Sequence, residues 1–319
     1  MSTMPGFQLE AQFREYVWGG QRLRPGQKTA EAWAVYEGNR ILSGPLSGLT
    51  LAEAAGEQGA ALLGELVVQR FGAGPRGARF PLLIKLLDCA DWLSLQVHPN
   101  DARAEALAGP GHYGKTEAWH ILEADLDAEI LCGFRAGVER PAALAAVRDG
   151  TILDVAQRVP LQTGETVFIP AGTLHALGPG LLVYEVQQSS DITYRVFDWN
   201  RPASAGRKLH IDESLAVLDT SATSRPLPPQ PFKDGARARL ITCPYFSLDL
   251  LTAENQALAF HTHGQTFHTL TVIEGAVEVQ GDGWRLPLAK FETALVPAAA
   301  GAYEVSPVAK ARVLAASVE

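Results

Sequence analysis

Apolar and polar residues alternate along much of the chain, and this period of two is typical of β-strands. Residues 165–170 alternate in this way, and Pro170 and Gly172 then indicate a turn. His175 follows the turn, where we expect a hairpin to direct its imidazole back across a sheet. Residues 182–186 predict the returning strand.

Helical patterns are restricted to a few short segments. Residues 49–71 are rich in Ala, Leu and Glu and predict helices that are broken near Gly56 and Gly59. Residues 102–107 and 140–147 predict two more helices. The expected fold class is therefore mostly β with a few helices.

A proline-rich passage divides the strand patterns into two groups. Residues 224–237 contain this passage and predict a connection between domains. Residues 1–223 are then expected to form one domain with helical insertions, and residues 238–319 a second β domain. In the second domain the pattern predicts strands at 247–251, 269–273, 276–280, 293–296 and 311–315.

Composition narrows the class of partner and the compartment. Lys and Arg total 27 against 35 Asp and Glu, and the net charge of −8 argues against nucleic-acid and anionic-membrane surfaces. No protein partner is indicated. The N-terminus lacks the pattern of a secretory signal, and the three cysteines form no Cys-x-x-Cys site. We expect a cytoplasmic protein with reduced cysteines.

Five polar residues share strand faces in a way that suits a metal ion. Gln96 and His98 are two positions apart, as are Lys115 and Glu117, so each pair points to one face of its strand. Together with His175 they offer two imidazoles, one carboxylate and one amide oxygen. This set suits Zn²⁺ or a similar divalent ion with open positions. Any one of these residues alone would be an ordinary hydrogen-bonded side chain.

Four short motifs make the pattern resemble a known family. Residues 96–101, 115–117, 170–176 and 191–195 read QVHPND, KTE, PAGTLHA and DITYR. They occur in the order found in type I mannose-6-phosphate isomerases of the short bacterial form, and the resemblance runs from about residue 7 to the C-terminus. It implies two cupin, jelly-roll-like β-barrels and one Zn²⁺ ion per chain. It also implies the interconversion of mannose 6-phosphate and fructose 6-phosphate through an enediolate.

The resemblance also implies roles for the polar residues. His98, Glu117 and His175 correspond to the zinc ligands. Gln96 corresponds to a residue that is a ligand in some members and lies behind the ligands in others.

Four further residues are candidates for the acid–base and electrostatic roles in the reaction. The resemblance places Arg195 at the active site, where a permanently charged guanidinium would stabilise the enediolate or position substrate oxygens. Asp191 has the strand parity of Arg195 and is expected to orient it or relay a proton. Lys115 and Lys85 are the acid–base candidates, and Lys115 ranks first because it lies two residues from Glu117.

The second β domain lacks the residues needed for a metal site. Residues 298–303, which follow Pro297, contain no histidine, and Phe267 stands where a glutamate is expected. We therefore interpret this domain as a degenerate cupin barrel without metal ligands. Its histidines are then bystanders: His261, His263 and His268.

Phosphate recognition and the reaction class leave alternatives open. The phosphate could meet Arg201, Arg207 and Lys208, or the backbone of the Trp18–Gly20 loop. The alternative functions are another metal-dependent cupin enzyme, such as an oxygenase or a different sugar isomerase, and a non-catalytic sugar-binding cupin. An oxygenase fits the mixed ligand set poorly, and a non-catalytic sugar-binding protein leaves the combination of ligands with Arg195 unexplained.

Overall fold

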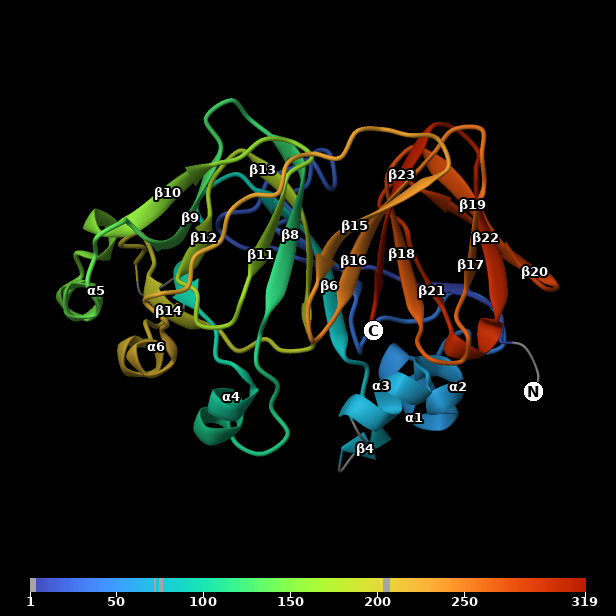
Figure 1. The fold of residues 1–319 in the computed structure, drawn as a ribbon, viewed down its shortest axis with the longest axis horizontal. Coiled ribbons are helices and arrows are strands. Elements are labelled where there is room, and N and C mark those ends of the chain that lie inside the picture. The colour runs from blue at the N-terminus through green and yellow to red at the C-terminus, as the bar shows by residue number, and fades with distance from the viewer. Residues whose placement is uncertain (1–3, 72, 75–76, 203–206) are drawn as a thin grey trace. The chain divides into compact units, whose positions relative to one another are not determined.

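The computed structural model describes residues 4–71, 73–74, 77–202 and 207–319, and strands dominate it (Figure 1). The expected mostly β fold is confirmed. The three helical segments predicted from the sequence are also present, and one further helix, α6, was not predicted. No helix in the described ranges is long and apolar enough to cross a membrane. The helices are α1 (Leu51–Gln58), α2 (Ala60–Leu63), α3 (Glu65–Phe71), α4 (Asp101–Ala108), α5 (Arg140–Asp149) and α6 (Ile211–Val217).

The boundaries of the first helices follow from their capping residues. Thr50 accepts a hydrogen bond from the backbone of Glu53, and the Glu53 side chain accepts one from the backbone of Thr50. Gly56 lies inside α1, so the expected break there is wrong. The helix ends at Gly59, whose positive φ of 50° suits a glycine, and α2 ends at Gly64.

The chain divides into two compact units, each described by itself. The central unit comprises Phe13–Ala32 and Leu86–Pro229. The terminal unit comprises Met1–Gln12, Trp33–Lys85 and Gln230–Glu319. Helices α1 to α3 thus belong with the C-terminal strands, although residues 1–223 were expected to form one domain.

Two sheets form the central unit, and neither closes on itself within the described residues. The first has the order β10-β9-β12-β7-β14, and the second begins β11-β8-β13-β6 and continues through β3 and β2. The first contains β10 (Ala156–Pro160), β9 (Glu129–Phe134), β12 (His175–Leu177), β7 (Leu95–Val97) and β14 (Tyr194–Phe197). The second contains β11 (Thr166–Ile169), β8 (Glu117–Ala124), β13 (Leu181–Gln188), β6 (Leu82–Cys89), β3 (Glu31–Val35) and β2 (Gln12–Arg14).

The five-stranded sheet of the central unit is buried on both faces. Leu95 and Val97 of β7 pack with Val147 of α5 and Val217 of α6 on its outer face. The residue between them, Gln96, consequently points to the inner face. Elsewhere between the two sheets the core is apolar: Trp119, Ile121, Val167 and Val183 meet Ile130 and Leu177. Gln96 and the polar residues on either side of β7, Ser94 and His98, therefore face the other sheet.

The expected hairpin between residues 165–170 and the returning strand at 182–186 is wrong, because β11 and β13 each pair with β8 and not with each other. β11 pairs with β8, whereas β12 pairs with β7 and β9, so the two strands lie in different sheets. The turn between them has Gly172 at φ 90°, and its amide donates to the carbonyl of His98 at 2.8 Å. Pro170 lacks the N–H group that continued pairing requires. The chain therefore crosses from one sheet to the other at this point.

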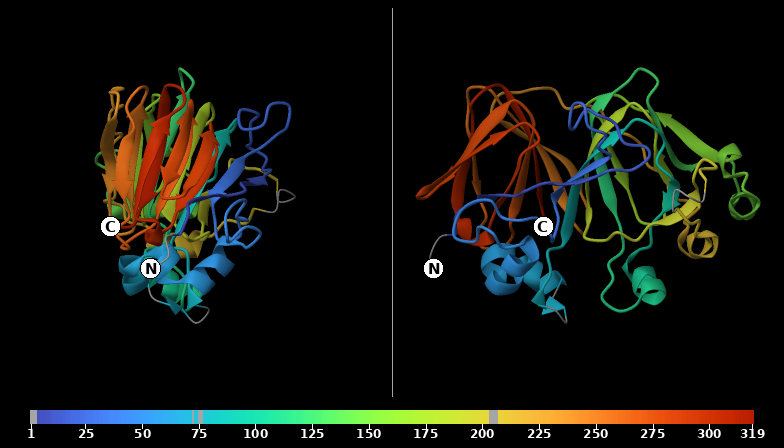
Figure 2. Two further views of the ribbon diagram at one scale, coloured as in Figure 1. Left: turned by 90° about the vertical axis from the view of Figure 1, so that its right-hand side faces the viewer. Right: turned by 180° about the vertical axis from the view of Figure 1, so that it is seen from behind.

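The terminal unit consists of two sheets with helices at one end. In Figure 2, α1 to α3 gather at one end of its strands. All five strands predicted in this region are present. One sheet contains β1 (Phe7–Gln8), β21 (Thr293–Val296), β18 (His268–Glu274), β23 (Ala311–Ser317), β16 (Ser247–Ala253) and β15 (Ala236–Thr242). The other contains β17 (Leu258–His261), β22 (Ala302–Pro307), β19 (Ala276–Gly281) and β20 (Trp284–Ala289), and β4 (Ala73–Gly74) pairs separately with β5 (Gly77–Ala78).

Candidate metal centre

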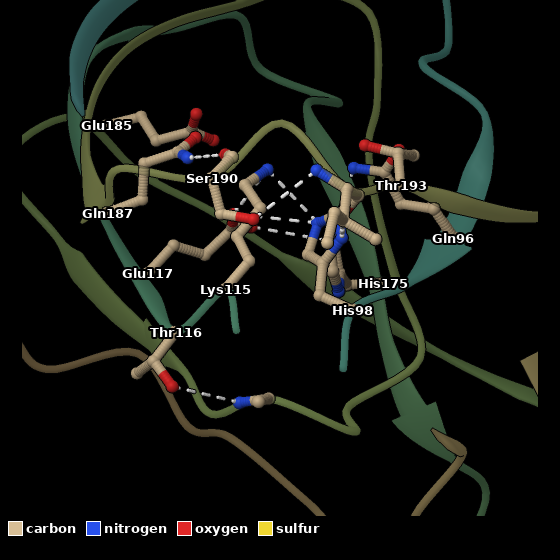
Figure 3. Close-up of polar contacts among 12 residues, drawn as sticks. Gln96, His98, Lys115, Thr116, Glu117, His175, Glu185, Gln187, Ser190 and Thr193 are labelled. Carbon is tan, nitrogen blue, oxygen red and sulfur yellow. Dashed lines mark hydrogen bonds and ion pairs between the residues drawn. The ribbon is translucent and has the colours of Figure 1, made fainter. Parts of the chain in front are cut away.

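Two imidazoles and one carboxylate converge between the sheets of the central unit (Figure 3). His98, Glu117 and His175 are at most 1% exposed, and one ligand atom from each lies within 4.8 Å of the others. His98 follows β7 and His175 begins β12, while Glu117 begins β8 in the other sheet. The cluster therefore bridges the two sheets of the central unit.

Hydrogen bonds behind the cluster determine which imidazole nitrogens face it. Nδ1 of His98 lies 2.9 Å from the carbonyl of Ile192, and Nδ1 of His175 lies 2.9 Å from the carbonyl of Thr173. A carbonyl can only accept, so each Nδ1 carries the hydrogen and each Nε2 keeps its lone pair. The two Nε2 atoms lie 3.6 and 3.3 Å from the oxygens of Glu117.

The protonation state of His175 also suits a metal ligand. Burial lowers the pKa of His175 to about 4, so the ring is neutral at neutral pH. A neutral imidazole whose Nε2 carries no hydrogen is the form that binds metal ions through that atom. Two such nitrogens and one buried carboxylate fit Zn²⁺ with positions left open for substrate or water. Among the described residues, no other three His, Cys, Asp or Glu side chains meet in this way.

Lys115 lies directly at the cluster, as its position two residues from Glu117 predicted. Its Nζ is 2.8 Å from Oε2 of Glu117 and 3.1 Å from Nε2 of His98. The side chain is 5% exposed, so the ammonium and the carboxylate form a buried ion pair. Lys115 therefore contacts two of the three candidate ligands directly.

Gln96 lies beside the cluster with its amide nitrogen toward it. Residue 175 is the cross-strand partner of residue 96, and Nε2 of Gln96 lies 3.3 Å from Nε2 of His175. The amide oxygen accepts from the hydroxyl of Ser94 at 3.3 Å. In this orientation the amide nitrogen of Gln96 faces the cluster as a hydrogen-bond donor. Direct ligation of a metal by the amide oxygen would require the amide group to turn.

Two arginines lie beside Ser94 and Gln96. Arg195 on β14 pairs in register with Gln96. Arg207 donates from Nη2 to Ser94 at 2.8 Å, and its Nε lies 3.3 Å from Asp198. Burial and the nearby charge of Arg195 lower the pKa of Arg207. Within the described ranges, Nη1 of Arg207 and Nε of Arg195 are buried nitrogens with no hydrogen-bond partner.

The other two residues proposed from the sequence lie in different surroundings. Asp191 is exposed and precedes β14, so strand parity does not relate it to Arg195, and no ion pair joins the two among the described residues. Lys85 is buried on β6, and its Nζ lies 5.4 Å from the centre of the Trp33 ring.

Two buried polar residues of β13 escaped the sequence analysis. Oε2 of Glu185 accepts from the indole of Trp119 at 2.9 Å, and that indole lies edge-on to His175 with ring centres 5.4 Å apart. Gln187 pairs in register with Glu117 and donates to the carbonyl of Ser190 (Figure 3). The signal that could have identified them is the presence of polar residues at alternate positions of an otherwise apolar strand.

Comparison with known proteins gives consistent matches. Residues 7–136 match the family model of the phosphomannose isomerase type I catalytic domain. Mannose-6-phosphate isomerase ManA of Bacillus subtilis (strain 168) is 33% identical over 96% of each chain. A crystal structure of the mannose 6-phosphate isomerase from Bacillus subtilis is 28% identical over 98% of this chain and 99% of that one, with a TM-score of 0.82. A mannose 6-phosphate isomerase structure bound with zinc and yttrium is 20% identical and covers 99% of this chain and all of that one, with a TM-score of 0.74.

Proposed function

This chain belongs to the type I mannose-6-phosphate isomerase family, and we propose that it interconverts mannose 6-phosphate and fructose 6-phosphate. The observation that carries the proposal is the buried cluster of His98, Glu117 and His175 with Lys115 beside it. We further propose that each unit is a cupin-like barrel and that only the central one is catalytic. The cytoplasm is the proposed compartment, and a sugar phosphate is the partner.

One Zn²⁺ ion per chain is the proposed cofactor. His98, Glu117 and His175 would hold it, and Gln96 would join them if its amide turned. Their N, N and O donors suit zinc, and a relative with the same fold binds zinc. Bound zinc supplies a Lewis acid that stabilises negative charge on the sugar oxygens.

Lys115 is the proposed acid–base residue. Isomerisation moves a proton between C2 and C1 of the sugar and another between the two adjacent oxygens. A group that exchanges these protons must lie within hydrogen-bond reach of the bound sugar. Lys115 meets this condition through its contacts with Glu117 and His98. Lys85 and the exposed Asp191 are secondary candidates, and Asp191 is suited to exchange of protons with solvent.

The phosphate group is proposed to bind at Arg207 and the enediolate charge at Arg195. Both guanidiniums present buried nitrogens without a hydrogen-bond partner among the described residues, and an anion would satisfy them. The Trp18–Gly20 loop is a less suitable phosphate site because two of its backbone amides already donate hydrogen bonds within the protein. Gly19 donates to the carbonyl of Tyr16, and Gly20 donates to the carbonyl of Asp88.

Metal analysis combined with a coupled isomerase assay tests this function. We expect stoichiometric metal and turnover of mannose 6-phosphate, with far less turnover of glucose 6-phosphate and free mannose. His175→Ala should lose both metal and activity, whereas the matched variant of an exposed histidine, His112→Ala, should keep both. A His175→Ala protein that retained metal and full activity would show that the site is wrongly assigned. Binding of the sugar phosphate without turnover would favour the sugar-binding alternative.

A further inference from the structure

The turn that follows β14 holds two successive non-glycine residues in the left-handed region. Trp199 has φ 54° and Asn200 has φ 53°. The amide of Arg201 donates to the carbonyl of Asp198 at 3.0 Å and closes the turn. Asn adopts this conformation readily, but a bulky aromatic residue is strained in it. Such strain persists only where the surroundings hold the residue in place.

The indole of Trp199 provides that restraint. Its Nε1 donates to the carbonyl of Leu93 at 2.7 Å. Its ring lies 4.7 Å from the ring of Trp92 and 5.5 Å from that of Phe197, measured between centres. The turn is therefore anchored to the segment that enters β7, one residue before Ser94.

The anchored turn begins with a buried carboxylate that contacts two arginines. Asp198 is 6% exposed. Its Oδ1 accepts from Nη1 of Arg201 at 2.9 Å, and its Oδ2 lies 3.3 Å from Nε of Arg207. Arg201 is further held by Asp91 at 2.8 Å and by the carbonyl of Trp92.

Asp198 and Ser94 together fix the direction of the Arg207 guanidinium. This group is planar, and its donors have a rigid geometry. Nε is taken by Asp198 and Nη2 by Ser94. The remaining nitrogen, Nη1, is buried and has no hydrogen-bond partner in the described part of the chain. Two fixed contacts thus leave one edge of the group available to an anion.

We propose that Asp198, held by the left-handed turn at Trp199 and Asn200, positions Arg207 for the phosphate group of the substrate. The proposal rests on the proposed function, in which Arg207 binds that phosphate. Asp198 does not touch the reacting atoms, so it is a positioning residue. It should affect the binding of phosphorylated ligands more than the rate of proton transfer.

Asp198→Asn tests this role because it keeps the shape of the side chain and removes its charge. We expect KM for mannose 6-phosphate to rise about tenfold with kcat nearly unchanged, the pattern of a lost interaction that binds the ground state and the transition state equally. The inhibition constant of inorganic phosphate should rise by the same factor, and bound metal should stay at the wild-type level. Asp127→Asn, which changes an exposed aspartate of the same unit, should leave all three values unchanged.

Two results for Asp198→Asn would contradict the positioning role. Unchanged KM and phosphate inhibition in Asp198→Asn, or a fall in kcat alone, would overturn the proposal. If Asp198→Asn does not fold, Trp199→Gly replaces it, since glycine tolerates the turn but lacks the anchoring indole. The same rise in KM is expected there, and an unchanged KM would contradict the role of the turn.

A direct binding measurement separates this proposal from the proposed function. Calorimetric titration with inorganic phosphate needs no turnover, so it compares wild type with Asp198→Asn even if the chain is not an isomerase. Weaker phosphate binding in the variant would support positioning of Arg207. Equal binding would exclude it, whatever reaction the wild-type chain catalyses.

Discussion

At the scale of single residues, the candidate metal centre depends on the backbone carbonyls that hydrogen-bond to its two histidines. The residue types and the spacing of Gln96, His98, Lys115 and Glu117 were sufficient to predict the side chains that meet. The two backbone carbonyls that set the imidazole tautomers could not be predicted in this way. They belong to irregular segments whose path depends on tertiary packing, and His175 depends on one of them.

Glu117→Gln should remove the metal and destabilise the metal-free protein. The substitution leaves the Lys115 ammonium buried without its carboxylate, 2.8 Å away in the wild type. Breaking a buried ion pair in this way costs about 3 kcal/mol or more. Urea denaturation in the presence of a chelator measures the loss. Glu123→Gln, an exposed position on the same strand, is the control, and equal stability of the two variants would contradict the buried pair.

Lys115→Met should separate proton transfer from metal binding. Removal of a general acid–base group lowers kcat by about 10²- to 10⁴-fold. The metal should remain because Lys115 is not one of the three proposed ligands. Metal content and kcat for mannose 6-phosphate check both parts. A wild-type kcat in Lys115→Met, together with a large loss in Lys85→Met, would transfer the role to Lys85.

At the scale of elements, the placement of strands in sheets was harder to predict than their existence. The pattern located the strands at 165–170 and 182–186 and five strands of the second domain within a few residues, because the period of two reports which face is buried. It carries no information on which strand is the partner. For that reason residues 165–170 and 182–186 were expected to form a hairpin, although β11 and β13 each pair with β8 and the chain crosses to the opposite sheet before His175. The polar ends of β7, β8 and β12 meet only because of that crossing.

Gly172→Ala should weaken the crossing between the sheets. Gly172 has φ 90°, and an added Cβ would lie 3.1 Å from Cβ of Asp219. We expect a loss of about 1–2 kcal/mol in the free energy of unfolding, together with weaker metal binding. Gly137→Ala is the matched control, because Gly137 has φ 83° with nothing within 4 Å of an added Cβ. A smaller loss at Gly172 than at Gly137 would contradict the close packing of the turn.

At the scale of the whole molecule, the chain path could not be predicted from local patterns. The two β-rich regions and the proline-rich passage between them were visible in the sequence. The grouping of residues 33–85 with 230–319 was not, because it depends on contacts between distant segments, such as the hydrogen bond from the amide of Leu66 to the carbonyl of Gln265 at 3.1 Å. Long-range pairing of this kind leaves no local signal.

The stability of the whole molecule should fall as the pH falls from about 6.5 to about 4. Burial lowers the pKa of His268 to about 4, and its Nδ1 lies 2.6 Å from the hydroxyl of Tyr303. An unfolded histidine titrates near 6.5, so the unfolded state binds more protons in this range. We expect His268 to contribute a loss of about 2–3 kcal/mol. Urea denaturation at pH 7.5 and 4.5 measures it, and His268→Phe should show a smaller decrease. Equal decreases in both proteins would contradict the role of His268.

Removal and return of the metal tests the central claim most directly. Dialysis against a chelator should abolish the isomerisation of mannose 6-phosphate, and one equivalent of Zn²⁺ per chain should restore it. The claim requires this because, within the part of the chain that the structure describes, the cluster of His98, Glu117 and His175 is the proposed catalytic metal site. Full activity in a chain shown to be free of metal would contradict the account.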